Sequence, residues 1–250
     1  MPIYIYKGNS QISTNAIRND KAVKAIYAKE QREEAVCVWG INLNILPFTY
    51  TKSETSITIT GLESGVMMKH LRVPDTIENV PVTTIASDAF ANNTRLEYIR
   101  LPNSLIDIGS RAFSGCKGLM SITIPDGVTY IYDSVFMNCT GLTSITIPNS
   151  VTRIGYETFK GCKGLTNIII PNSVTTINSS TFQYCTGLTN ITLPNSLTRI
   201  RTYAFYGCSS LTSITFNGTK AQWNTITKDS DWNAKTGNYT IHCTDGDISK

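Results

Sequence analysis

Residues 148–170 read PNSVTRIGYETFKGCKGLTNIII, and close copies of this stretch precede and follow it. Five complete units of 23 residues fill residues 102–216, and a first unit that is five residues longer occupies 74–101. Phenylalanine keeps the same phase in every unit, at Phe90, Phe113, Phe136, Phe159, Phe182 and Phe205. Cysteine does so in five units, at Cys116, Cys139, Cys162, Cys185 and Cys208. Recurrence at one fixed step is typical of proteins that stack a single structural unit.

The pattern within one unit predicts a strand followed by turns. Apolar and polar residues alternate at the end of 119–124, as in a strand, and Thr and Ile suit a pleated surface. Pro125 ends this strand because it cannot donate to a hydrogen-bond ladder. The segment that leads to Phe136 is too short for a free helix, so we expect one helical or 3₁₀ turn there. We expect a positive φ at the glycines that precede the strand leucine, Gly118, Gly141, Gly164 and Gly187.

Stacking is needed because one unit cannot bury its apolar side alone. In a stack, each Phe, Leu and Ile meets its own copy about one strand spacing away. Each buried side chain of this kind contributes roughly 1.5–3 kcal/mol. A parallel ladder of backbone hydrogen bonds then joins neighbouring coils.

The cysteines are predicted to be buried thiols. Copies of one position lie about 4.8 Å apart with parallel Cβ vectors, whereas a disulfide needs Cβ atoms that face each other. We expect weak S–H bonds to the loop backbone, and the same backbone contacts from Asn93, which holds this place in the first unit. Zinc needs about four convergent ligands, and no CxxC pair or histidine cluster is present.

The string Leu-x-x-Ile-x-Ile, with Phe-x-x-Cys before it and Pro-Asn-Ser-Val after it, closely resembles the BspA-type (Treponema-like) leucine-rich repeat. The resemblance covers residues 74–216. It implies a curved, right-handed repeat solenoid with a parallel β-sheet. It also implies a bacterial or protist surface protein of the adhesin kind, because family members are commonly of that type.

The chain outside the repeats is predicted to form two caps and a small module. Residues 51–73 hold an alternating strand at 56–60 and are expected to cover the first coil. Residues 217–250 are expected to cover the last coil, with a short helix that starts at Thr219 and a closing strand at 239–243. Trp223, Ile226 and Trp232 are available to cover its apolar face.

Residues 1–50 share nothing with the repeat. Segments 3–6, 23–27 and 35–39 alternate like strands of a β meander, and a helix over 22–34 is the competing interpretation. The short strings Tyr6-Lys7-Gly8 and Val38-Trp39-Gly40 resemble modules at the N-termini of phage and gut-bacterial structural proteins. That resemblance implies an attachment region through which the chain assembles.

Composition excludes several classes of function. The chain of 250 residues is 41 % apolar and 16 % charged, and its net charge of +4 is too small to indicate a nucleic-acid partner. No apolar run approaches the ~18 residues that span a bilayer, so membrane insertion is not expected. The N-terminus lacks the basic and apolar regions of a secretion signal, so we expect no signal in this chain.

No constellation in the sequence predicts catalysis or a cofactor. The carboxylates of the repeats fall at different repeat positions, whereas acid–base chemistry needs a pair about 5–9.5 Å apart. His70 and His242 lack the Ser or Asp context of a triad. The glycines recur with the repeat and serve its turns rather than a phosphate loop. We therefore expect a protein that is not an enzyme and has no cofactor or metal.

Two surfaces are candidate binding faces, although each is also compatible with an ordinary solvent-exposed surface. The first is the outer face of the parallel sheet, at Tyr98, Arg100, Ser121, Thr123, Ser144, Thr146, Asn167, Ile169, Asn190, Thr192, Ser213 and Thr215. The second is the variable tier after the inner isoleucine, at Tyr132, Asp133, Tyr156, Glu157, Arg201 and Tyr203. Tyrosine offers a large contact area with a polar tip, as binding surfaces often do.

The sequence thus predicts an interaction or adhesion module that presents a rigid solenoid surface to a protein or glycan partner. The alternative hypothesis is a structural component of a virion or a cell-surface assembly, anchored through residues 1–50. An extracellular or surface location is what the resemblance implies, and a virion is the alternative location.

Overall fold

The computed structural model describes residues 5–7, 10–12 and 46–249. Ile5–Lys7 (β1) and Ser10–Ile12 (β2) pair as an antiparallel hairpin, which overlaps the first strand expected in this region. The other elements expected near the N-terminus, over 22–39, lie outside the described residues. Most of the expected attachment region therefore lies outside them too.

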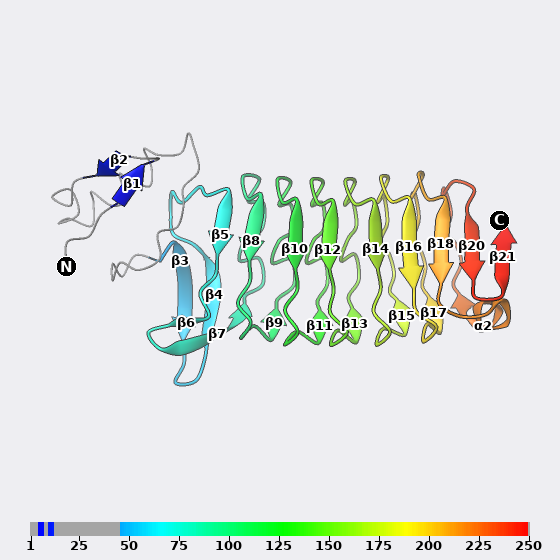
Figure 1. Ribbon diagram of the computed structural model, residues 1–250, viewed down its shortest axis with the longest axis horizontal. Coiled ribbons are helices and arrows are strands. Elements are labelled where there is room, and N and C mark those ends of the chain that lie inside the picture. Colours follow the sequence, from blue (N-terminus) through cyan, green and yellow to red (C-terminus); the bar gives the residue numbers. More distant parts are fainter. Residues whose placement is uncertain (1–4, 8–9, 13–45, 250) are drawn as a thin grey trace.

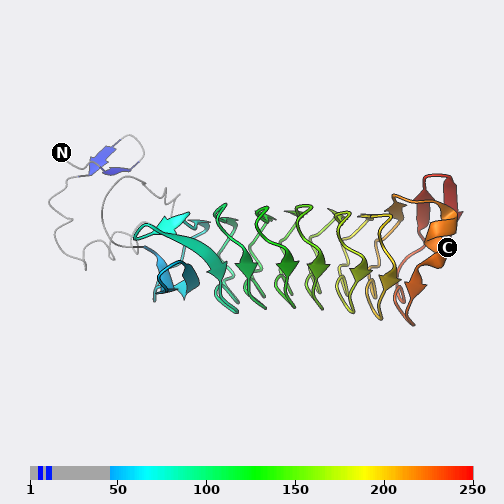
Figure 2. The same ribbon diagram turned by 90° about the horizontal axis from the view of Figure 1, so that it is seen from below.

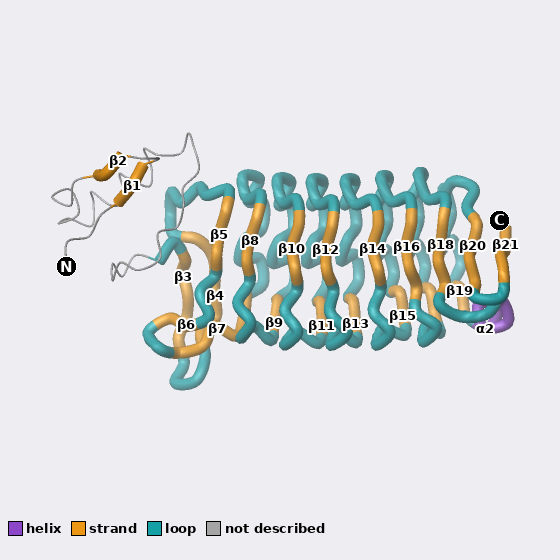
Figure 3. Tube along the Cα trace, viewed as in Figure 1, coloured by secondary structure: helices purple, strands orange, loops and turns teal. Residues whose placement is uncertain are grey.

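Six coils stack in one row between two end caps, as Figures 1 and 2 show from two directions. We number them in chain order as 74–101, 102–124, 125–147, 148–170, 171–193 and 194–216. Each coil adds one strand to a long-strand sheet and one to a short-strand sheet, with turns between them (Figure 3). The predicted leucine-rich-repeat solenoid with 23-residue units is confirmed.

The strands of the long-strand sheet, from β5 to β20, run parallel to one another. They are β5 (His70–Arg72), β8 (Tyr98–Arg100), β10 (Ser121–Thr123), β12 (Ser144–Thr146), β14 (Asn167–Ile169), β16 (Asn190–Leu193), β18 (Ser213–Phe216) and β20 (Thr240–Cys243). Gly246–Ser249 (β21) ends the sheet antiparallel to β20. The short-strand sheet holds β4 (Ile57–Leu62), β7 (Val80–Ile85), β9 (Asp107–Ile108), β11 (Tyr130–Ile131), β13 (Arg153–Ile154), β15 (Thr176–Ile177), β17 (Arg199–Ile200) and β19 (Thr227–Lys228).

A column of phenylalanine rings runs through the core. The rings from Phe90 to Phe205 stack on one another, with neighbouring centroids 5.3–5.7 Å apart and planes 4–12° from parallel. All six side chains are buried. Each ring therefore meets its own copy in the next coil, as the repeat predicts.

The repeat cysteines form a second buried column and are all free thiols. Each Sγ donates to the carbonyl of the phenylalanine one coil earlier, at 3.0–3.1 Å. Asn93 does not act like the thiols. Its Oδ1 accepts the backbone N–H groups of Arg95 and Leu96 at 3.3 and 3.2 Å.

The prediction of positive φ at Gly118, Gly141, Gly164 and Gly187 is wrong, because none of the four adopts it. They are needed for a different reason. A Cβ at Gly118 would lie 2.6 Å from the carbonyl oxygen of Thr94, and one at Gly164 would lie 2.7 Å from that of Thr140. Glycine is required here because the backbones of successive coils approach too closely for a side chain.

The positive φ angles lie in the segment that joins each short strand to the next long strand, which we call the turn side. Its first left-handed position holds Asp88, Arg111, Ser134, Glu157, Ser180 and Tyr203. Its second holds Asn92, Gly115, Asn138, Gly161, Tyr184 and Gly207. Around Phe136, Met137 N donates to Ser134 O and Cys139 N to Phe136 O, both at 3.1 Å. Successive tight turns thus replace the helical or 3₁₀ turn that we expected.

Both sheets are interrupted within the array, which the repeat does not predict. The long-strand sheet breaks between β12 and β14, on coils 3 and 4. The short-strand sheet breaks between β13 and β15, on coils 4 and 5, where β14 and β16 stay paired, and we call this second break the seam. The turn side continues across this seam, since Phe159 N donates to Thr181 O at 2.9 Å. At the seam, Asn178 Nδ2 donates to Ile154 O at 2.6 Å. At the equivalent position of the next coil, the backbone N–H of Arg201 donates to Ile177 O. The side-chain amide of Asn178 thus replaces a backbone donor.

The N-terminal cap confirms the strand expected at 56–60. Phe48–Lys52 (β3) pairs antiparallel with β4, which continues in parallel to β7 of coil 1. Because β3 crosses residue 50, the cap begins before the boundary expected there. Phe48 closes the aromatic column edge-on, 6.4 Å from Phe90. The extra residues of the first unit form a hairpin of Thr76–Ile77 (β6) with β7.

The C-terminal cap also follows the prediction. Lys220–Thr225 (α2) begins at the N-cap Thr219, whose side chain accepts the backbone N–H of Gln222. Trp223 packs edge-on against Phe216 at 5.3 Å, and Trp232 against Phe205 at 5.9 Å. The closing strand β20 adds to the long-strand sheet. These aromatic rings cover the apolar end of coil 6.

Candidate functional site

The outer face of the long-strand sheet carries the first set of candidate residues. All twelve lie on strands β8 to β18, and pairs such as Ser121 with Ser144 and Asn167 with Asn190 stand in register. Among the twelve, only Tyr98 and Ile169 are large apolar side chains with substantial exposure, 46 % and 66 %. This face therefore offers many short polar groups and few bulky anchors.

The second set of candidates divides into two groups, the first of which lies on coils 3 and 4. Tyr132 is half-buried, with its ring centroid 4.2 Å from that of Tyr130. Asp133 Oδ1 accepts the backbone N–H of Tyr156 at 2.8 Å, so it supports the next coil. Glu157 forms an ion pair of 2.6 Å with a lysine of its own turn. The carboxylates in this group thus already have partners within the solenoid.

The other group lies on coil 6, where Tyr203 belongs to a cluster of aromatic side chains that we call the tyrosine cluster: Tyr184, Tyr203 and Tyr206. The ring of Tyr206 meets those of Tyr184 and Tyr203 edge-on at 5.5 and 5.2 Å. Tyr184 and Tyr203 are 45 % and 39 % exposed. Lys235 Nζ lies 5.1 Å from the Tyr206 ring, and contact with Tyr206 raises the pKa of Lys235. Arg201, on the same coil, has a buried Nε without a hydrogen-bond partner in the described chain.

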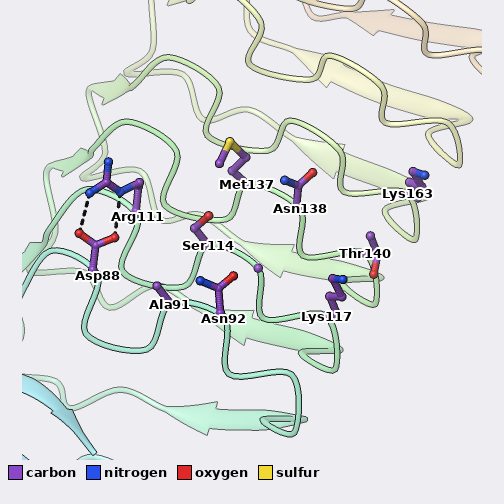
Figure 4. A pocket seen from close by; sticks show the side chains of 11 residues that line it. Asp88, Ala91, Asn92, Arg111, Ser114, Lys117, Met137, Asn138, Thr140 and Lys163 are labelled. Carbon is purple, nitrogen blue, oxygen red and sulfur yellow. Dashed lines mark hydrogen bonds and ion pairs between the residues drawn. The ribbon is translucent and has the colours of Figure 1, made fainter.

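A polar recess opens on the turn side of coils 1 to 4, and Figure 4 shows the side chains around it. Its volume is about 590 Å³. The lining consists of Asp88, Ala91, Asn92, Arg111, Ser114, Gly115, Lys117, Met137, Asn138, Thr140 and Lys163. Neither this recess nor the contact between Tyr184 and Tyr206 is predicted from the sequence. Two repeat positions carry a signal that could have indicated the recess. Asn alternates with Gly at one of them, and Lys alternates with Thr at the other, from one unit to the next.

Burial makes the repeat cysteines unreactive. It raises the pKa of Cys116, Cys162 and Cys208 to about 12, and that of Cys139 and Cys185 well above 9.0. A thiolate is the nucleophile and metal ligand, so a thiol held protonated serves neither purpose. Within residues 5–7, 10–12 and 46–249, no three His, Cys, Asp or Glu side chains gather as metal ligands.

His242 faces an acidic residue, Asp247, although the sequence around it does not suggest a catalytic triad. Its Nδ1 lies 2.9 Å from Asp247 Oδ1, across the pairing of β20 with β21. Both side chains are exposed. Cys243 points to the opposite face of β20, since successive strand residues alternate. The pair thus lacks a neighbouring cysteine nucleophile and joins two strands.

Comparison with known proteins agrees with this architecture. The family model for the BspA type leucine rich repeat region, in six copies, matches residues 67–187 and 129–240. The chain belongs to the BspA-type leucine-rich repeat family. No curated protein matches the chain. No helix in the described part is long and apolar enough to cross a membrane.

Several solved structures of leucine-rich repeat proteins are similar to this family member. The T. pallidum leucine rich repeat protein is 31 % identical, with a TM-score of 0.63, and the match covers 68 % of this chain and 83 % of that one. A protein from Eubacterium ventriosum is 25 % identical, with a TM-score of 0.62 and coverage of 80 % and 54 %. One from Bacteroides ovatus is 23 % identical, with a TM-score of 0.55 and coverage of 79 % and 71 %.

Proposed function

We propose that this BspA-type protein is a non-enzymatic adhesion module that binds a protein partner through its tyrosine cluster. The observation that carries the proposal is the exposure of Tyr184 and Tyr203 around the ring of Tyr206 on adjacent coils. Protein interfaces are enriched in tyrosine, and a few large aromatic side chains supply most of the binding energy.

The rest of the molecule supports this role. The coils are joined by stacked rings and backbone ladders, so the cluster sits on a rigid frame and loses little conformational freedom on binding. Leucine-rich repeat solenoids create extended binding surfaces of this kind. A surface location is proposed because the family to which the chain belongs suggests it.

The test uses the whole chain, immobilised and exposed to a panel of purified extracellular-matrix proteins and neutral glycans. We expect at least one protein to bind. Tyr184→Ala with Tyr203→Ala should weaken that binding about tenfold or more, since anchor tyrosines dominate interfaces. The matched control is Tyr98→Ala with Tyr156→Ala, which removes two exposed tyrosines from the two other candidate surfaces.

The control pair should bind like the unaltered chain. Loss of binding only in the Tyr98→Ala, Tyr156→Ala control would show that the partner binds elsewhere than the tyrosine cluster, and would contradict the proposal. Binding of a neutral glycan alone, with no protein bound, would contradict the class of partner.

A further inference from the structure

The recess on coils 1 to 4 is lined by three small residues and by polar or charged side chains, together with Met137. Gly115 is one of the lining residues and has φ near 73°, and a Cβ there would overlap the side-chain oxygen of Asn92. Ala91 and Ser114 are two further small residues in the lining. Small side chains at these positions thus leave the space that forms the recess.

The recess is positively charged. Three cationic side chains and one carboxylate line it, which gives the lining a net charge of +2. Arg111 is neutralised by Asp88, whose carboxylate it contacts through two hydrogen bonds of 2.8 Å. Lys117 and Lys163 are exposed and form no ion pair within the described part of the chain. The two lysines therefore supply the free positive charge.

The two lysines follow the repeat with a period of two coils. Lys117, Thr140 and Lys163 occupy one repeat position on coils 2, 3 and 4 and stand in one row in Figure 4. At about 4.8 Å per coil, the lysine positions are about 9.6 Å apart with a hydroxyl between them. Asn92 and Asn138 alternate with Gly115 in the same way on the parallel row.

This arrangement suits an extended anionic chain better than a single anion. A phosphate is bound by donors that converge on one point, as in a backbone nest, whereas these lysines stand two coils apart. Single-stranded nucleic acid needs aromatic side chains on which its bases stack, and none lines the recess. The amides and hydroxyls between the lysines can bond to the hydroxyl groups of sugars. One β-linked sugar advances a chain by about one coil, so charges on alternate sugars would meet lysines on alternate coils.

The geometry points to a binding site for an acidic polysaccharide in this recess, with Lys117 and Lys163 contacting carboxylate or sulfate groups on alternate sugars. Asn138 and Thr140 contact the hydroxyls of the sugar between the two lysines, and Asn92 contacts the hydroxyls of the preceding sugar, on coil 1. The site is separate from the tyrosine cluster on coils 5 and 6, so it does not depend on the proposed protein partner.

The experiment titrates the full chain into a fluorescent hyaluronan oligosaccharide, which carries one carboxylate on every second sugar. Lys117→Gln with Lys163→Gln should weaken binding about tenfold, because charge-assisted hydrogen bonds are lost. Lys117→Arg with Lys163→Arg should preserve binding, since the charge remains. The matched control is Lys52→Gln with Lys69→Gln, exposed lysines paired with Glu78 and Glu97, which lowers the net charge equally.

We expect the control to bind like the unaltered chain, and the methyl ester of the oligosaccharide not to bind. Heparin binding that is also lost in the Lys117/Lys163 glutamine variant would support the site with sulfate as the preferred anion. Equal binding by that variant and the control would overturn the proposal. So would the absence of binding to both polysaccharides, or equally tight binding of poly-L-glutamate. Tyr184→Ala with Tyr203→Ala should leave hyaluronan binding unchanged, which separates this site from the tyrosine cluster.

Discussion

Phe159 lies in the middle of the aromatic column, fully buried between Phe136 at 5.7 Å and Phe182 at 5.4 Å. Replacing it with alanine leaves a cavity that a stacked coil cannot close, because both neighbouring coils are held in register. We expect Phe159→Ala to lower the free energy of unfolding by about 3–5 kcal/mol.

Urea denaturation followed by circular dichroism measures this change. Tyr156→Ala on the same coil is the control, since its side chain is 38 % exposed. A loss for Phe159→Ala no larger than about 0.5 kcal/mol, the usual range for a surface substitution, would contradict the stacked core.

The buried thiols give the protein a predictable sensitivity to alkali. An exposed cysteine has a pKa near 9.0, whereas burial raises the pKa of Cys162 to about 12. Well below pH 9 the thiol is protonated in both states. As the pH rises from 9 toward 12, only the unfolded chain releases the proton, so stability falls. Between about pH 8 and pH 10.5 this single thiol accounts for a loss of about 2 kcal/mol.

Cys162→Ala removes that contribution. In reducing buffer, the variant should lose about 2 kcal/mol less stability than the unaltered chain over the same pH interval, measured by urea denaturation. Cys243→Ala is the control, because that thiol is only half-buried. An equal alkaline loss in Cys162→Ala and the unaltered chain would show that the thiol is not held protonated.

At the scale of elements, the seam between coils 4 and 5 is a place where one of the two sheets is interrupted. The short-strand sheet does not cross it, and the hydrogen bond from Asn178 Nδ2 to Ile154 O replaces a backbone bond. Asn178 is 5 % exposed. Asn178→Ala leaves a buried carbonyl without its donor, which lowers stability by about 1–3 kcal/mol. Hydrogen exchange should accelerate on both sides of the seam, at β13 and β15.

Mass-spectrometric hydrogen exchange of peptides from each coil measures the effect. Asn172→Ala, an exposed position on coil 5, serves as the control and should leave exchange unchanged. Faster exchange spread equally over all coils would argue against a local seam.

For the whole molecule, the caps keep a stack of apolar coils soluble. The last coil ends in Phe205 and Phe216, against which Trp232 and Trp223 of the C-terminal cap pack edge-on. A chain that ends at residue 216 would expose these rings together with the free edge of β18. We expect this chain to associate or aggregate.

Size-exclusion chromatography with light scattering measures that outcome at several concentrations. A chain that ends at residue 245 removes β21 but retains both tryptophans and β20, and serves as the control. A stable monomer that ends at residue 216 would show that the C-terminal segment is not a cap.

Much of this solenoid follows from the 23-residue repeat, because stacking places identical positions over one another. Phe159 and Cys162 could thus be assigned to buried columns, and Thr219 to the start of the cap helix, from pattern alone. The repeat does not show whether a glycine is needed for a positive φ or because two backbones lie close together. The sequence predicts that Gly118 is a turn residue. In the structure, the backbone of coil 1 at Thr94 lies too close to Gly118 for a side chain.

The candidate sites depend on the tertiary structure because each combines residues from different coils and from different repeat positions. Tyr184 and Tyr206 occupy different repeat positions, so their contact follows from the path of the turn side rather than from spacing. At the seam, the side chain of Asn178 bonds to the backbone of the preceding coil, a contact that the repeat does not specify. A periodic sequence therefore specifies what each coil buries, since burial repeats with the unit. Residues that depart from the period form the recess and the tyrosine cluster. Only the stacking of the coils brings these residues together, so the sequence alone does not locate the two sites.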